Sequence, residues 1–120
     1  MENKYSLETQ AEIENILEEI HFKDSFFIKY EFFLDGWAIF LKEKTIYPRL
    51  IIIFKSYLKN YFSIKSFEIN NNYKKERYNQ LYFVEEIKSP EELIKEVKAV
   101  IYGKDIMNYT SKKYYQYFEK

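Results

Sequence analysis

Residues 26–44 read FFIKYEFFLDGWAIFLKEK, and this stretch decides the fold. Two runs rich in aromatic and β-branched residues, 26–34 and 37–44, flank the dipeptide Asp35-Gly36. Asp-Gly is favoured in two-residue type I′ turns because both central residues of such a turn need a positive φ. The stretch therefore predicts a β-hairpin that turns at Asp35-Gly36.

That turn would set the register of the hairpin and assign its two faces. The expected core face pairs Leu34 with Trp37, Phe32 with Ile39, Tyr30 with Leu41 and Ile28 with Glu43. The reverse face pairs Phe33 with Ala38, Glu31 with Phe40 and Lys29 with Lys42, a mixture that indicates partial cover or a contact surface.

The segments on either side of the hairpin extend it into an α+β domain. Apolar residues recur at helical spacing over 6–20, with Ser6 as the expected N-cap and Ile13, Ile16, Leu17 and Ile20 as the buried stripe. Further β-rich runs at 49–57, 61–69 and 78–86 predict an antiparallel meander of about five strands.

A second helix is expected where the strands end. Ser89-Pro90-Glu91-Glu92 has the pattern of a capping box with proline at the first helical position. Leu93, Ile94, Val97, Val100 and Ile101 supply its apolar stripe, and Gly103 is placed to end it. Residues 105–120 are a candidate further helix. The prediction is one α+β domain spanning 1–120, and the alternative layout is a strongly curled sheet that encloses a ligand cavity.

The composition is poor in the groups from which most enzyme sites are built. The chain has two glycines, one histidine and no cysteine. Phosphate-cradling loops and nucleophile turns need glycine, and thiolate metal sites need cysteine. His21 follows a predicted helix, where the macrodipole favours it, and has no second histidine with which to bind a metal. We therefore expect no catalytic residue, no metal site and no cofactor.

Charge and hydropathy restrict the partners. The formal net charge is zero, and only Arg49 and Arg77 among the 19 basic residues are arginine, which disfavours nucleic-acid binding. No run is long and apolar enough to predict a membrane span, and no signal peptide is recognisable. The absence of cysteine fits a reducing compartment, so we expect a cytoplasmic protein.

Two sets of residues are candidates for contact with another protein. The first helix carries Glu8, Glu12, Glu14, Glu18 and Glu19, with no lysine or arginine between Leu7 and Ile20. Such an acidic face would complement a basic partner surface and steer its approach. The second set is aromatic and contains Tyr73, Arg77, Tyr78 and Tyr82, together with Phe33 and Phe40 of the hairpin. Tyrosine and arginine often dominate interface energetics.

This layout, with its acidic first helix and its closing helix at Ser89-Pro90-Glu91-Glu92, resembles small bacterial immunity proteins. These are cytoplasmic proteins that neutralise polymorphic or contact-dependent growth-inhibition toxins. The resemblance implies a non-enzymatic protein that occludes a toxin, with Glu12, Glu19 and nearby aromatics as contacts. The alternative is a small-ligand-binding or enzymatic domain in which a buried carboxylate, such as Glu31 or Glu85, lies in an aromatic-lined cavity.

Overall fold

The computed structural model of the chain describes residues 4–20, 23–70 and 77–106 and confirms the α+β layout. A helix is followed by five strands and a second helix, with short 3-10 turns at Lys23–Ser25 and Lys104–Ile106. Of the candidate helix at 105–120, residues 107–120 lie outside the described part of the chain. The main elements are α1 (Lys4–Glu19), β1 (Phe26–Phe33), β2 (Gly36–Glu43), β3 (Arg49–Ser56), β4 (Tyr61–Asn70), β5 (Arg77–Ile87) and α2 (Pro90–Ile101).

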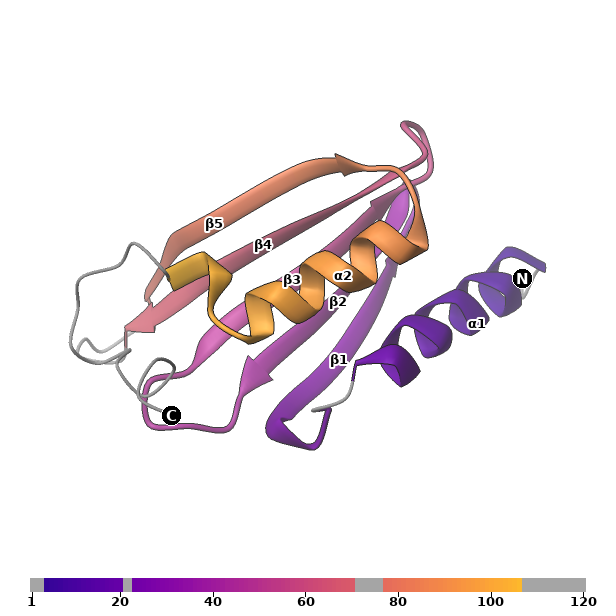
Figure 1. Ribbon diagram of the computed structural model, residues 1–120. Coiled ribbons are helices and arrows are strands. Elements are labelled where there is room, and N and C mark those ends of the chain that lie inside the picture. Colours follow the sequence, from indigo (N-terminus) through magenta and orange to yellow (C-terminus); the bar gives the residue numbers. More distant parts are fainter. Residues whose placement is uncertain (1–3, 21–22, 71–76, 107–120) are drawn as a thin grey trace.

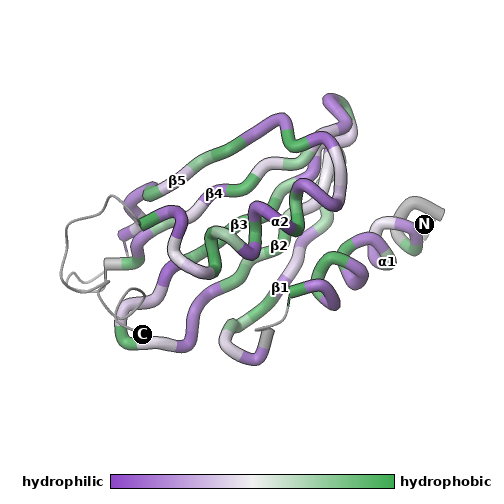
Figure 2. The backbone as a smooth tube through the Cα atoms, viewed as in Figure 1, coloured by the Kyte–Doolittle hydropathy of each residue, from purple (hydrophilic) through white to green (hydrophobic). Residues whose placement is uncertain are grey.

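The five strands form one antiparallel sheet in the order β1-β2-β3-β4-β5. Helix α2 crosses one face of this sheet, and α1 lies toward the β1 side (Figure 1). Buried residues of both helices join one core with the inward-facing residues of the strands. Hydrophobic residues follow one another along β3, whereas α1 alternates hydrophobic and hydrophilic positions (Figure 2). The core includes Ile13, Ile16, Ile20, Trp37, Ile39, Leu41, Ile51, Ile53, Ile64, Leu93, Val97 and Val100.

The predicted hairpin is present, but its turn and register differ from the prediction. Phe33 pairs with Gly36, so Leu34 and Asp35 are the two loop residues, and Phe32 lies opposite Trp37. Neither loop residue has a positive φ, so the expected type I′ turn at Asp35-Gly36 is wrong. The register moves by two residues, which keeps every side chain on its expected face.

Close packing explains why glycine is needed at position 36. A Cβ at Gly36 would lie 1.9 Å from the carbonyl oxygen of Lys55 on β3. The glycine therefore permits the backbones of β2 and β3 to approach each other closely. From the sequence alone, the need for glycine at this position was attributed to the turn.

The predicted core face of the hairpin is only half buried. Trp37, Ile39 and Leu41 on β2 are fully buried, as predicted. On β1, Phe32 is 49% exposed, and Leu34 in the loop that follows is completely exposed. β1 is an edge strand, so its C-terminal end is paired with a described strand on one side only.

The first helix begins before its predicted N-cap. It starts at Lys4, which places Ser6 inside the helix and makes the N-cap prediction wrong. Ile13, Ile16 and Ile20 are buried as predicted, while Leu7 is 67% exposed.

The predicted start and end of α2 are both confirmed. Ser89 is the N-cap, and its hydroxyl accepts a hydrogen bond from the Glu92 amide at 3.1 Å. Pro90 occupies the first turn, where its missing N–H costs no hydrogen bond. After the C-cap Tyr102, Gly103 has φ 105°, the left-handed conformation that commonly ends a helix.

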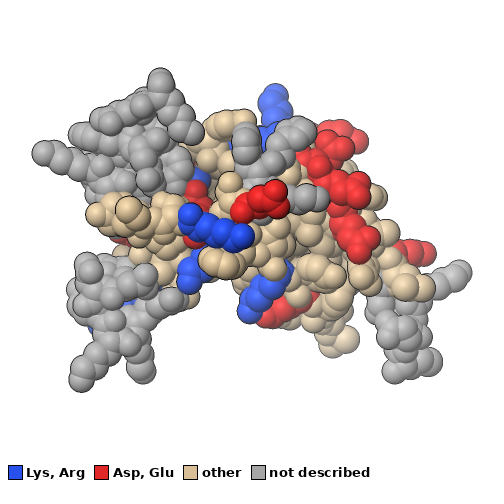
Figure 3. All heavy atoms as spheres, turned by 90° about the horizontal axis from the view of Figure 1, so that it is seen from below, with Lys and Arg blue, Asp and Glu red and all other residues tan. Residues whose placement is uncertain are grey.

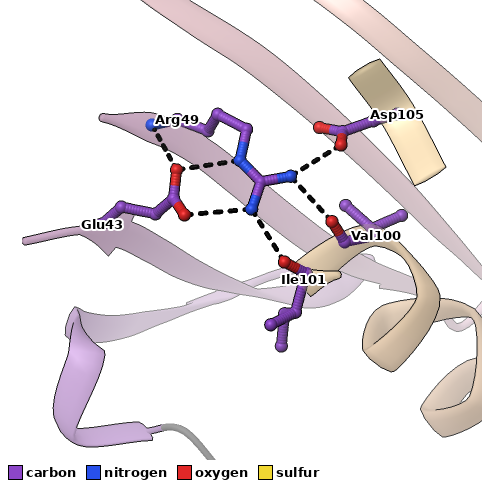
Figure 4. A network of polar contacts seen from close by, with 5 residues as sticks. All are labelled: Glu43, Arg49, Val100, Ile101 and Asp105. Carbon is purple, nitrogen blue, oxygen red and sulfur yellow. Dashed lines mark hydrogen bonds and ion pairs between the residues drawn. The ribbon is translucent and has the colours of Figure 1, made fainter. Parts of the chain in front are cut away.

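A buried arginine joins the end of α2 to the sheet. Arg49 is fully buried and lies between Glu43 on one side and Asp105 with the last turn of α2 on the other (Figure 4). Its Nε and Nη2 donate to the two Glu43 oxygens at 2.8 and 2.9 Å, and its Nη1 donates to Asp105 at 2.6 Å. The carbonyls of Val100 and Ile101 accept at 2.7 and 3.1 Å. All donor groups of the guanidinium are thus used.

The same network sets the ionisation of Asp105. Burial raises the pKa of this carboxyl, and the Arg49 guanidinium beside it works in the opposite direction. The arginine only partly offsets the effect of burial, so the pKa of Asp105 stays above its usual value but lower than it would be without the guanidinium.

We predict that Arg49→Met lowers the free energy of unfolding by about 3–5 kcal/mol, because it leaves a buried carboxyl and two helix-terminal carbonyls without their donor. Urea unfolding followed by circular dichroism measures this change. Lys65→Met replaces an exposed strand lysine and is the control, expected to stay within about 0.5 kcal/mol of the wild type.

The deficit of Arg49→Met should also depend on pH. With the guanidinium gone, the pKa of Asp105 rises further, so the folded state takes up a proton more readily than the unfolded chain. Through this group, folding becomes more favourable as the pH falls, and the deficit is expected to be smaller near pH 5 than near pH 7. A deficit that grows on acidification would contradict this account of Asp105.

Candidate functional site

A groove of about 1000 Å³ lies between α1 and α2. It forms because the two helices lie on the same sheet face and each uses only one stripe of residues to cover the core. Its lining residues from α1 are Glu8, Ala11, Glu12, Asn15, Ile16, Glu18 and Glu19, and those from α2 are Pro90, Glu91, Ile94, Lys95 and Lys98.

The lining combines apolar side chains with an excess of acidic ones. Ile16 is buried and Ile94 is half-buried. Five carboxylates line the groove, against the ammonium groups of Lys95 and Lys98. Acidic side chains gather at the end of the molecule where α1 lies (Figure 3). The groove therefore presents apolar surface within a negative field, which suits a partner that carries basic and apolar groups together.

One of these glutamates also holds α1 against the sheet. Glu12 Oε1 accepts a hydrogen bond from the indole Nε1 of Trp37 at 2.9 Å, and its Oε2 lies 2.8 Å from Nζ of Lys55. A further hydrogen bond of 2.9 Å joins Thr9 to Tyr57. The charge of Glu12 is thus partly used inside the protein, whereas Glu8, Glu18 and Glu19 are exposed.

Glu18 and Glu19 occupy a position that is unfavourable for helix stability. They lie in the last turn of α1, which contains no basic residue. The negative end of the helix macrodipole disfavours anions there by roughly 0.3–1 kcal/mol each. Folding therefore gives no reason for carboxylates at these two positions.

The acidic residues predicted from the sequence lie together along the groove, and residues of α2 complete its lining. Glu8, Glu12 and Glu19 all line the groove, with Glu18 between them. The contribution of Ile94, Lys95 and Glu91 from α2 was missed, because the lining residues of the two helices lie far apart in the chain and meet only in the tertiary structure. The amphipathic pattern of α2 was the available signal, since it predicted that both helices cover one sheet face.

The aromatic set is divided between several places. Phe33, Phe40 and Tyr78 lie on the sheet face opposite the helices, where Phe40 and Tyr78 line a hollow of about 430 Å³. Phe33 packs near Phe54, with ring centroids 6.3 Å apart. Arg77 is exposed at the first position of β5, and Tyr73 lies outside the described residues.

Tyr82 instead lies on the helix-bearing side of the sheet, where it contacts α2. It packs against the core and donates a hydrogen bond to Glu96, which also accepts from Lys104 Nζ at 3.0 Å. Partial burial and the bond to Glu96 raise the pKa of Tyr82. Burial also works to raise the pKa of Glu96, but the hydrogen bonds from Tyr82 and Lys104 outweigh it, and the net pKa is below its usual value.

The expectation of a buried glutamate at position 31 or 85 is wrong. Glu31 and Glu85 are both exposed, because each lies on an edge strand of an open sheet. The buried carboxyl residues in the described part of the chain are Glu68 and Asp105. Within residues 4–20, 23–70 and 77–106, no cluster of three acidic, histidine or cysteine side chains is arranged to hold a metal ion.

Comparisons of this chain with protein-family models, with curated proteins and with solved structures find no match. Neither described helix combines the length and the apolar character needed to cross a bilayer.

We predict that Glu12→Leu destabilises the protein by about 1–3 kcal/mol, because the buried indole N–H of Trp37 loses its acceptor. Glu12→Gln keeps an oxygen for Trp37 and loses only the charge opposite Lys55, so its cost should be below about 1 kcal/mol. Trp37 is the single tryptophan, so its fluorescence reports unfolding in urea. Glu14→Leu, at an exposed position of the same helix, is the control and should have little effect.

Proposed function

We propose that this protein is a non-catalytic binding protein that receives a basic partner protein in the groove between α1 and α2. The observation that carries the proposal is the groove lining, in which five glutamates surround apolar side chains and only two lysines oppose them. An apolar contact area supplies affinity, while the surrounding negative charge selects a basic partner and speeds its arrival.

Within this class, we propose an immunity protein that neutralises a cognate bacterial toxin in the cytoplasm. Support comes from the resemblance in layout described above and from an acidic surface that folding does not explain. Enzymes that cleave nucleic acids need basic surfaces to hold their substrates. An inhibitor with an acidic groove would cover such a surface and exclude the substrate, so that its output is affinity and not chemistry.

Co-expression tests this function directly. The product of the adjacent reading frame is expressed in a bacterial host alone and together with this protein. Growth arrest that is relieved by co-expression, with a stable complex on purification, is the expected result. A neighbouring product that neither binds this protein nor affects growth would contradict the immunity function.

Charge reversal locates the interface on that complex. We predict that Glu18→Lys and Glu19→Lys each lower the association rate constant by about tenfold at low salt, with a smaller effect at high salt. Lysine in the last turn of α1 also suits the helix macrodipole, so both variants should stay folded. Stopped-flow or surface plasmon resonance kinetics measure the rate.

Glu14→Lys is the matched control. It makes the same change of net charge on the same helix, at an exposed position that does not line the groove. Its association rate is expected to stay within about twofold of the wild type. Equal slowing by all three variants would place the interface elsewhere.

A further inference from the structure

The two edges of the sheet differ in how they are protected against pairing. The edge strand β5 is interrupted by two register shifts against β4, and Glu86 within it has a positive φ of 63°. Irregularities of this kind prevent a further strand from pairing. β1 pairs with β2 in unbroken register from Phe26 to Phe33, and no strand of the described residues pairs with its outer edge, which presents an uninterrupted row of backbone donors and acceptors.

Apolar side chains are exposed on both faces of β1. On the sheet face opposite the helices, Phe27 is 62% exposed and Phe33 is 42% exposed. On the helix-bearing face, Tyr30 and Phe32 are exposed. The only charged residues of the strand are Lys29 and Glu31, which form an exposed ion pair of 3.3 Å. A regular, apolar edge strand of this kind is suited to pairing with another strand.

The sequence of β1 is complementary to itself in one antiparallel register. When Tyr30 lies opposite Tyr30 of a second copy, Lys29 faces Glu31 of that copy and Glu31 faces its Lys29. The same register pairs Phe27 with Phe33 and Ile28 with Phe32, each of them twice.

Two registers next to the one centred on Tyr30 also keep the helix-bearing faces of both sheets on the same side. Both of these registers are unfavourable. A slip of one pairing step in one direction sets Glu31 opposite Glu31, and a slip in the other sets Lys29 opposite Lys29. Like charges directly opposite each other destabilise a strand pair, so the charges select the register centred on Tyr30.

We propose that β1 is a self-association site, at which two copies of the chain pair antiparallel about a two-fold axis at Tyr30 and join their sheets into one. No residue of β1 lines the groove between α1 and α2, so the dimer does not depend on the proposed function. Backbone hydrogen bonds would supply the affinity, and the crossed Lys29–Glu31 pairs would supply the specificity.

Complementary charge variants test the register. Size-exclusion chromatography with light scattering over a concentration series should give the wild type a mass twice that of the 14.9 kDa chain. Lys29→Glu and Glu31→Lys should each raise the dimer dissociation constant by about tenfold or more, because each puts like charges opposite one another. An equimolar mixture of the two variants should dimerise again, since one copy then carries two glutamates and the other two lysines.

Circular dichroism checks that each variant is folded, which is expected because both substitutions are at exposed positions. A wild type that is monomeric at every concentration would overturn the proposal. Single variants that dimerise as well as the wild type, or a mixture that does not recover, would also overturn it.

Single cysteines give an independent test in a chain that has none. Tyr30→Cys places the two thiols on the two-fold axis, where directly opposed strand residues lie about 4.5–5.5 Å apart and within disulfide range. Phe32→Cys, on the same face of the strand, is the control, since its two copies would be four residues apart along the strand. Mild oxidation should cross-link Tyr30→Cys and leave Phe32→Cys uncross-linked, and equal cross-linking of both would contradict the register.

Discussion

The buried guanidinium of Arg49 is the interaction on which the arrangement of this protein depends. It joins the end of β2 through Glu43, the last turn of α2 through two carbonyls, and the following 3-10 turn through Asp105. A buried charge is costly unless its donors are all satisfied, and here each is used. Apolar packing alone would allow α2 to slide along the sheet, whereas these directional bonds fix its end. The position of α2 in turn fixes one wall of the groove.

A second polar contact fixes the other wall. Glu12 ties α1 to Trp37 and Lys55, so the helix that carries the acidic residues is held by one of its own carboxylates. The remaining glutamates of α1 face outward or into the groove, and the two in its last turn oppose the helix macrodipole. The formal net charge of zero therefore conceals an uneven distribution, in which acidic side chains gather at the end of the molecule where α1 lies. A binding surface, and not a reaction centre, is the feature that this arrangement supports best.

Local sequence signals predicted most of the elements. Alternating β-rich runs located the five strands, and the Ser89-Pro90 pair with Gly103 located both ends of α2, because caps and strand propensity act over a few residues. The prediction of a type I′ turn at Asp35-Gly36 was wrong for a physical reason. Asp35-Gly36 satisfies the rule for a type I′ turn, yet Gly36 is needed for its lack of a Cβ beside the backbone of Lys55. The glycine can be read from the sequence, whereas the nearby backbone of Lys55 that requires it is known only from the tertiary structure.

By itself, the sequence determined the class of fold, the inward faces of the two helices and of β2, and the acidic character of α1, since these follow from hydrophobic periodicity and residue type. It also identified Glu8, Glu12 and Glu19 as members of one candidate surface. Only the tertiary structure decided that Ile94 and Glu91 of α2 complete that surface, that Tyr82 packs against the core while Tyr78 lies on the opposite face, and that β1 is an edge strand of the sheet. These features depend on contacts between segments far apart in the chain, and such contacts are set by the packing of the whole domain and not by any local stretch.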